Sequence, residues 1–226
     1  MNRLYVLAAV MALIAFMPAA PAAAEDDKKL KAEPFEFVGK AGDCGAAAGT
    51  DIVTAKWLDG MGLVDNPGSD KKDKRQGLLL SKNGPTADCS SAGARIKGVK
   101  GMDASAPFLL GFDYRGGGHC GAGAPRFNVV TTKDGTESFH FVGGCANGAS
   151  IPSTEDAQWY RVRFALADPA TAFPPVASGS TIVSITILYD EGTDAPSAQD
   201  PMGVGLAVID NIYVNGQTIG DKKDSD

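Results

Sequence analysis

Apolar and polar residues alternate with a period of two along several segments of the chain's second half, and this alternation constrains the fold most strongly. The clearest case is Phe108 to Arg115, where large apolar side chains occupy every second position. Trp159 to Leu166 and Thr181 to Asp190 alternate in the same way. Because successive side chains of a β-strand point to opposite faces, each segment is expected to be a strand with one apolar face.

Turn-forming residues separate these segments from other short apolar runs. The chain has 28 glycines and 13 prolines, which favours strands joined by many turns. A first strand is expected to start around Phe35 to Val38, and further strands are expected at 52–58, 77–81, 94–99, 126–142 (a hairpin), 204–214 and 217–219. The sequence therefore predicts an all-β fold, an antiparallel two-sheet, jelly-roll-like β-sandwich. One sandwich domain is expected over residues 35–220, with a flexible charged leader at 25–34 and a disordered polar tail at 221–226.

The N-terminus has the pattern of a secretory signal peptide over residues 1–24. A positive start at Arg3 precedes an apolar run from Leu4 to Met17, and Ala22-Ala23-Ala24 offers a signal peptidase site. The run is too short to span a membrane. The mature chain is expected to be secreted or periplasmic, without stable membrane insertion. The formal net charge of −6 argues against nucleic acid and anionic membranes as partners.

Four cysteines follow the predicted cleavage site, and in an exported chain they favour two disulfides. Cys120 and Cys145 flank the two ends of the expected hairpin, so they are expected to pair, which leaves Cys44 to pair with Cys89. Zinc is the alternative, but it favours a Cys-x-x-Cys spacing that the sequence lacks.

The hairpin at 126–142 is expected to turn at the three-residue loop Lys133-Asp134-Gly135. This register sets two apolar pairs on one face, Phe127 with Phe141 and Val129 with Phe139, and Asn128 opposite His140 on the polar face.

The second half of the chain resembles the jelly-roll sandwiches of the galactose-binding-like superfamily, which includes many carbohydrate-binding modules. Three stretches carry the resemblance: Gln158 to Phe164, Ile182 to Tyr189, and Val208 to Gly216 with its Ile-Asp-Asn-Ile segment. It covers about residues 94–219. The resemblance implies sugar binding on a concave sheet or at loop tips, together with a structural calcium.

A ligand-binding surface is expected on the polar faces of neighbouring strands. Its guanidinium, amide, carboxylate and imidazole groups suit sugar hydroxyls or acidic groups, and an indole offers an apolar platform. The predicted residues are Asp113, Arg115, Arg126, Asn128, His140, Trp159, Arg161 and Arg163. The alternative is a sheet face that merely contacts solvent.

Asp210 and the two histidines are further candidates. By alternation Asp210 points with Val208 and Ile212 toward the core, where a carboxylate must be paired, hydrogen-bonded or metal-bound. A calcium ion could use Asp210 with oxygens from the acidic loop after residue 189, or Asp210 could accept backbone N–H bonds at a strand bend. His119 and His140 lack a spaced second ligand and are expected at the surface.

The sequence contains no motif for a catalytic triad, a metalloprotease or a phosphate loop. We therefore expect a secreted, non-enzymatic binding module, with no cofactor other than the alternative calcium, that takes a glycan on the polar sheet face. One alternative is an envelope or extracellular structural protein that binds a protein partner or envelope component. The other is a jelly-roll glycoside hydrolase or lyase, whose carboxylates can be distant in sequence.

Overall fold

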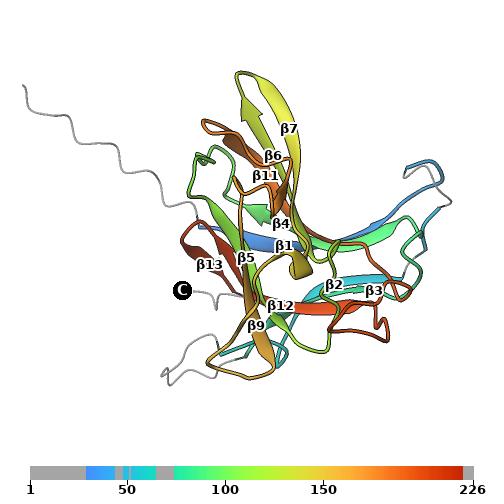
Figure 1. Cartoon of the computed structure of the whole chain (residues 1–226). Coiled ribbons are helices and arrows are strands. Elements are labelled where there is room, and N and C mark those ends of the chain that lie inside the picture. The colour runs from blue at the N-terminus through green and yellow to red at the C-terminus, as the bar shows by residue number, and fades with distance from the viewer. Residues whose placement is uncertain (1–28, 44–47, 51, 65–73, 221–226) are drawn as a thin grey trace, which may run out of the picture.

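The computed structural model describes residues 29–43, 48–50, 52–64 and 74–220. The predicted signal peptide and polar tail lie outside the described residues, as does Cys44. The described chain forms two antiparallel sheets that pack face to face without an α-helix (Figure 1). This confirms the predicted all-β sandwich.

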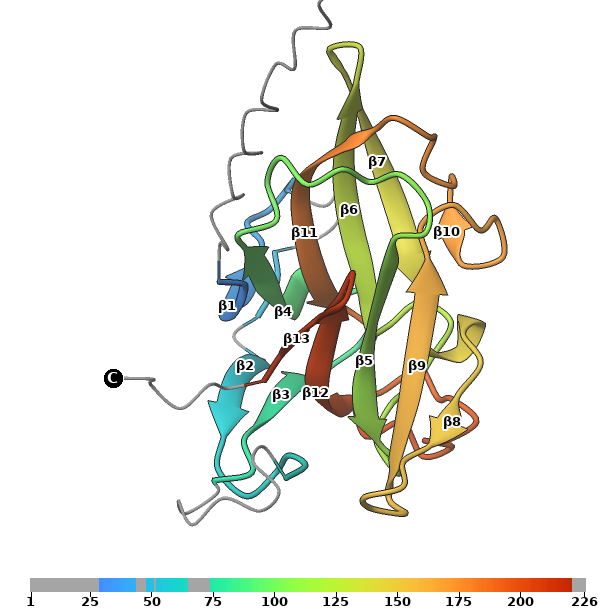
Figure 2. The same ribbon diagram turned by 90° about the vertical axis from the view of Figure 1, so that its left-hand side faces the viewer.

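Sheet A, as we call the first sheet, has six strands in the order β1-β4-β11-β6-β7-β10 (Figure 2). Their bounds are β1 (Lys31–Val38), β4 (Ser90–Lys97), β11 (Thr181–Tyr189), β6 (Arg126–Lys133), β7 (Thr136–Gly143) and β10 (Ala172–Phe173). Strands β4 and β11, far apart in sequence, are neighbours at its centre.

Sheet B has seven strands, in the order β2-β3-β12-β5-β9-β8, with β13 paired to β12. Their bounds are β2 (Val53–Leu58), β3 (Gly77–Lys82), β12 (Leu206–Val214), β5 (Leu109–Arg115), β9 (Trp159–Ala165), β8 (Ile151–Pro152) and β13 (Gln217–Ile219). A short 3-10 helix, η1 (Cys145–Asn147), follows β7.

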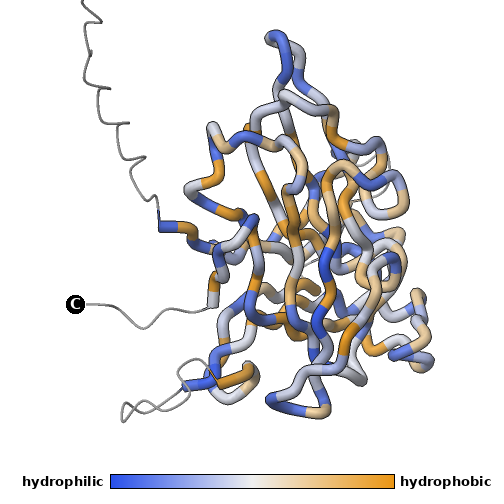
Figure 3. Tube along the Cα trace, turned by 60° about the vertical axis from the view of Figure 1, so that its left-hand side comes forward, coloured by the Kyte–Doolittle hydropathy of each residue, from blue (hydrophilic) through white to orange (hydrophobic). Residues whose placement is uncertain are grey.

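The core lies between the two sheets and is built from the apolar sides of the alternating strands. At its centre the rings of Phe112, Phe127 and Phe164 lie with centroids 5.8 to 6.3 Å apart, an arrangement that adds favourable ring contacts to the burial of apolar area. The tip of the β6–β7 hairpin is hydrophilic (Figure 3). The apolar side of the period-two pattern therefore lies in the core for β5 and β9, as predicted.

Strand β1 begins earlier than the sequence suggests. Residues 31–34 pair with Ala94–Lys97 of β4, so the expected flexible leader is wrong for these four positions. An outer edge strand can form from charged residues because its hydrogen bonds come from the backbone, and proline is tolerated there.

The predicted register of the hairpin is wrong by one residue. Lys133 pairs with Thr136, so the loop is the two-residue Asp134-Gly135, with φ of 51° and 77° at its two residues. Positive φ at both positions belongs to the turn that matches strand twist in a two-residue hairpin. Asn128 therefore faces Phe141, Val129 faces His140 and Val130 faces Phe139.

This shift exchanges the two faces of β7. His140 is buried and Phe139 and Phe141 are 48% and 43% exposed, the reverse of the expected arrangement. The Nδ1 of His140 lies 2.7 Å from the carbonyl of Pro174 and Nε2 lies 2.9 Å from Thr131 Oγ1. Since a carbonyl can only accept, Nδ1 donates, and both ring nitrogens are satisfied inside the protein.

A bulge in β12 changes a second expected side-chain direction. The pairing with β5 shifts between Asp210 and Tyr213, and Asn211 has a positive φ of 45°. Ile209 and Ile212 both reach the main core, whereas Val208 joins a separate cluster on the outer side of sheet B. Asp210 is therefore buried on that outer side and not in the sandwich core, because the bulge breaks the alternation.

Candidate functional site

The predicted ligand-binding residues do not form one surface. Arg126 and Asn128 lie on β6 in sheet A, whereas Asp113, Arg115 and the β9 residues lie in sheet B. His140 leaves the set because it is buried. The two groups occupy different sheets, so each outer face must be judged by itself.

On the outer face of sheet B, the carboxylate of Asp113 forms ion pairs with Arg161 and Arg163. Asp113 is fully buried and accepts hydrogen bonds from Arg161 at 3.0 and 3.2 Å and from Asn211 at 3.1 Å. Its Oδ1 also lies 3.6 Å from Arg163. The hydrogen bonds that Arg161 donates to Asp113 raise the pKa of Arg161, while burial lowers the pKa of Arg163. These groups satisfy one another's charges and hydrogen-bonding capacity, and they link the neighbouring strands β5, β9 and β12.

Another part of this face, around Trp159, is covered by the chain. Trp159 is only 2% exposed and packs with Leu63 and Val208, so its indole is not a platform for a ligand. Asp210 accepts the backbone N–H groups of Leu63 at 2.8 Å and Asn211 at 2.7 Å, which matches the expected role at a strand bend. Arg115 remains exposed and donates to Gln158 at 3.1 Å, beside a small hollow of about 260 Å³.

The outer face of sheet A carries a larger groove of about 650 Å³. It lies at the end of the sheet where β4 and β6 begin and where β1, β7 and β11 end. Phe37 on β1 and Phe141 on β7 line it, and they are 41% and 43% exposed. Its polar lining consists of Lys82, Thr86, Asp88, Ser90, Ser91, Arg126, Asp190 and Glu191. We take this groove as the candidate site.

Arg126 is held rigidly on the floor of the groove. Its guanidinium forms two bonds with the carboxylate of Asp190, at 2.6 and 2.7 Å, and donates to Gly123 O at 2.8 Å and Asn128 Oδ1 at 3.1 Å. The same group lies 4.5 Å from the centroid of the Phe141 ring. Paired bonds and ring stacking fix the direction of both Arg126 and Phe141 before any ligand arrives.

Lys82 links the loops at the rim of the groove by hydrogen bonds. It is 1% exposed, and its ammonium donates to the carbonyls of Thr86 at 2.9 Å, Asp88 at 2.6 Å and Asp190 at 3.0 Å. Burial lowers the pKa of Lys82, and the nearby carboxylates of Asp88 and Asp190 oppose that shift. All three donors are used, so Lys82 shapes the groove rather than offering hydrogen bonds to a ligand.

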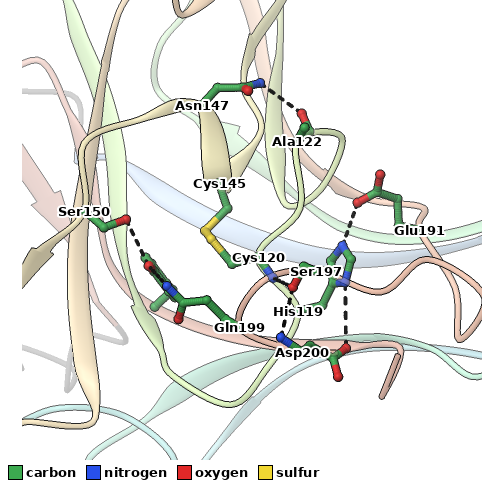
Figure 4. Close-up of a disulfide and its surroundings, with 11 residues drawn as sticks. His119, Cys120, Ala122, Cys145, Asn147, Ser150, Glu191, Ser197, Gln199 and Asp200 are labelled. Carbon is green, nitrogen blue, oxygen red and sulfur yellow. Dashed lines mark hydrogen bonds and ion pairs between the residues drawn. A yellow bond between two sulfur atoms is a disulfide. The ribbon is translucent and has the colours of Figure 1, made fainter. Parts of the chain in front are cut away.

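A buried histidine, His119, contacts the carboxylate of Glu191 in the groove lining. His119 Nε2 lies 2.6 Å from Glu191 Oε2, and Nδ1 lies 3.8 Å from Asp200 Oδ2 (Figure 4). His119 is 2% exposed, so its expected surface position is wrong. A side chain at Gly121 or Gly123 would collide with this pair, which explains why the loop is rich in glycine.

Further anchors hold the same loop. The predicted bridge between Cys120 and Cys145 is present, with a Cα–Cα distance of 4.9 Å (Figure 4). The second predicted bridge, Cys44 to Cys89, is not tested because Cys44 lies outside the described residues. Tyr189 packs its ring edge-on to His119 at 5.7 Å, and burial raises the pKa of its phenol.

Of the predicted ligand-binding residues only Arg126 lines the groove, and its aromatic walls and carboxylates were not predicted as ligand-binding residues. Phe141 was assigned to the core through the incorrect hairpin register, and Phe37 was taken only as part of a first strand. The Asp134-Gly135 dipeptide, a strong signal for a two-residue hairpin, could have corrected the register. Nothing local to Asp190 or Glu191 indicates that they face a groove.

Across the described residues, no cluster of three or more His, Cys, Asp or Glu side chains is arranged to hold a metal ion. In the same residues, no helix has the length and hydrophobicity needed to cross a membrane. No protein-family model, curated protein or solved structure matches the chain. The resemblance to galactose-binding-like sandwiches therefore depends on the strand pattern alone.

Proposed function

We propose that this protein is an exported, non-enzymatic binding module that takes a glycan in the groove of sheet A. The observation that carries the proposal is the groove itself, with a half-exposed phenylalanine at each side and a polar floor between them. The signal-peptide pattern supports export, and the Cys120–Cys145 bridge is compatible with an oxidising compartment.

The chemistry of the groove suits a sugar chain. Carbohydrate rings present C–H groups on their faces and hydroxyls around their edges, so they favour a surface that pairs aromatic rings with fixed polar groups. Three strands separate β1 from β7, and with a strand spacing of about 4.8 Å the two aromatic walls stand roughly 19 Å apart. This width suits an oligosaccharide better than a single sugar.

Rigidity supports a binding role as well. Arg126, Lys82 and Glu191 are each fixed by bonds within the protein. A groove that is already ordered loses less conformational entropy when a ligand binds, which favours affinity.

A protein-binding face is the second candidate, and the exposed aromatic cluster favours it. Phe139 and Phe141 meet edge to face at 5.5 Å, and Phe173 pairs with Phe141 across β10 and β7 and is 50% exposed. Aromatic residues gathered on an exposed sheet are typical of the cores of protein interfaces. A partner of this kind would cover β7 and β10 beyond the groove.

The two candidates separate in a binding experiment on the purified protein. A glycan array would identify oligosaccharides that bind, and isothermal titration calorimetry would compare the wild type with Phe37→Ala and Phe141→Ala. Loss of one stacked ring is expected to lower the affinity about tenfold, or 1.4 kcal/mol. Ile151→Ala is the control, since Ile151 is 63% exposed but lies in sheet B.

The outcomes are distinct. Glycan binding that persists unchanged in both phenylalanine variants would remove the groove from the proposal. Absence of glycan binding, together with a protein partner lost on Phe139→Ala and Phe173→Ala, would favour the interface. Release of shortened sugars during the titration would show an enzyme and contradict a non-enzymatic module.

A further inference from the structure

The charge and hydrogen-bonding capacity of the groove narrow the class of its ligand. Building on the proposed function, we infer that the groove selects a glycan bearing free amino groups, an oligomer of de-N-acetylated amino sugar, over neutral or acidic sugars.

Carboxylates outnumber cations in the lining. The charged lining residues are Asp88, Asp190 and Glu191 on one side and Lys82 and Arg126 on the other. The balance is therefore one negative charge in excess. An acidic sugar placed here would meet repulsion from the carboxylates, and an ammonium would meet attraction.

The two cations have almost no donors left for a ligand. Every N–H of Lys82 goes to a backbone carbonyl. Arg126 donates four hydrogen bonds, to Asp190, Gly123 and Asn128, and a guanidinium has five N–H donors. An acidic ligand would therefore find neither net attraction nor free donors at these side chains.

The carboxylates keep acceptor capacity on the groove side. The side chains of Asp190 and Glu191 are 35% and 24% exposed, although each already holds a partner. Glu191 binds His119 through Oε2, and its Oε1 lies beside Gly123, a residue of the groove wall. Because an ionised carboxylate accepts about four hydrogen bonds, both groups can take further donors from a ligand.

The aromatic walls complete the site for an amino sugar. An ammonium near the ring face of Phe37 adds a cation–π contact, while the ring of Phe141, which already holds the Arg126 guanidinium, is left to contact the apolar face of the sugar. Charge, acceptors and ring faces thus favour the same class, a sugar with donors and a positive charge.

The test compares three oligosaccharides of equal length by isothermal titration calorimetry: glucosamine oligomers with free amines, their N-acetylated counterparts and neutral β-glucan oligomers. We expect the free-amine oligomer to bind about tenfold more tightly than the N-acetylated one, because one hydrogen bond to a charged group is added. Raising the salt concentration should reduce this ratio, since the carboxylates are partly exposed.

Glu191→Gln and Asp88→Asn are the test variants, and Asp168→Asn, outside the groove lining, is the control. Each test variant is expected to reduce the ratio of the free-amine affinity to the N-acetylated affinity, and because this ratio is taken within one variant, a general change in groove shape does not account for it. Asp88 accepts hydrogen bonds from Thr50 N and Oγ1 and lies on a different loop from Glu191, so it gives an independent test if Glu191→Gln fails to fold.

Two results would overturn the inference and leave the proposed function standing. One is equal or tighter binding of the N-acetylated or neutral oligomer. The other is a free-amine preference that survives in both folded variants. Failure of all three oligosaccharides, and of a wider array, would instead contradict the proposed function itself.

Discussion

The outer faces of sheets A and B carry the same kinds of polar side chains, but they are used differently. On sheet B, Leu63 covers Trp159 and Val208, and Asp113 engages two arginines. On sheet A, aromatic rings stand exposed on both sides of Arg126. A solvated sheet face thus becomes a candidate site where, among the residues that the structure describes, aromatic rings on it stay exposed.

The two faces also differ in what fixes them. Sheet B's outer face is held by packing and by a buried carboxylate within its own strands. The groove of sheet A is held by loops, through the disulfide, the His119–Glu191 contact and the Lys82 bonds to three carbonyls. We therefore expect loop variants to change binding and sheet-B variants to change stability alone.

Replacing both Cys120 and Cys145 by serine should have the largest effect. The bridge spans 25 residues, and losing such a cross-link costs about 3 kcal/mol of the free energy of unfolding. Because the loop carries His119 and Gly123, affinity for the groove ligand should fall as well. Chemical denaturation and calorimetry measure the two effects. Full affinity in a destabilised but folded variant would show that ionic contacts alone hold the groove.

Asp113→Ala should destabilise the protein and leave ligand binding unchanged. Asn211 and two arginines lose a shared acceptor, although Arg161 is 49% exposed and water can replace part of its bonds. We expect a loss of about 2 kcal/mol in chemical denaturation. Arg161→Ala is the matched control and should cost less, because Asp113 keeps Arg163 and Asn211. A change in glycan affinity in either variant would mean that the two faces are coupled.

Much of the fold could be predicted from the sequence, because alternation reports directly on strands. The segments around Phe112, Phe164 and Ile187 were predicted as strands with buried apolar sides, and the structure buries these residues. The nearness of Cys120 and Cys145 followed from the hairpin that they flank. These features depend on local pattern and on short chain connections, which one sequence contains.

The site was harder to predict, because it depends on single-residue details and on distant segments. Moving Lys133 from loop to strand inverts β7, and since Phe139, Phe141 and Val142 are all apolar, hydrophobicity does not reveal the error. The bulge at Asn211 changes direction in a similar way. Coverage of sheet B by Leu63 is a tertiary contact with no signal in the covered strands.

The smallest expected effect concerns acid stability at the rim of the groove. Asp194 accepts bonds from Thr86 N at 2.6 Å and Thr86 Oγ1 at 2.7 Å, and these bonds hold the pKa of Asp194 below its ordinary 3.8. The folded state therefore binds this proton less readily than the unfolded state. The stabilisation is present above pH 3.8 and is lost as the pH falls through the lower pKa of the folded state.

Asp194→Asn should flatten the curve of melting temperature against pH in that acid range and slightly weaken glycan binding, because Thr86 lines the groove. Asp103 is the matched control: its pKa is also lowered, by Ser105, but it lies outside the groove lining. Asp103→Asn should flatten the same part of the curve without changing affinity. If both variants change the affinity equally, acid stability and the shape of the groove are not linked through Thr86. The groove of sheet A then depends less on its loops than we infer.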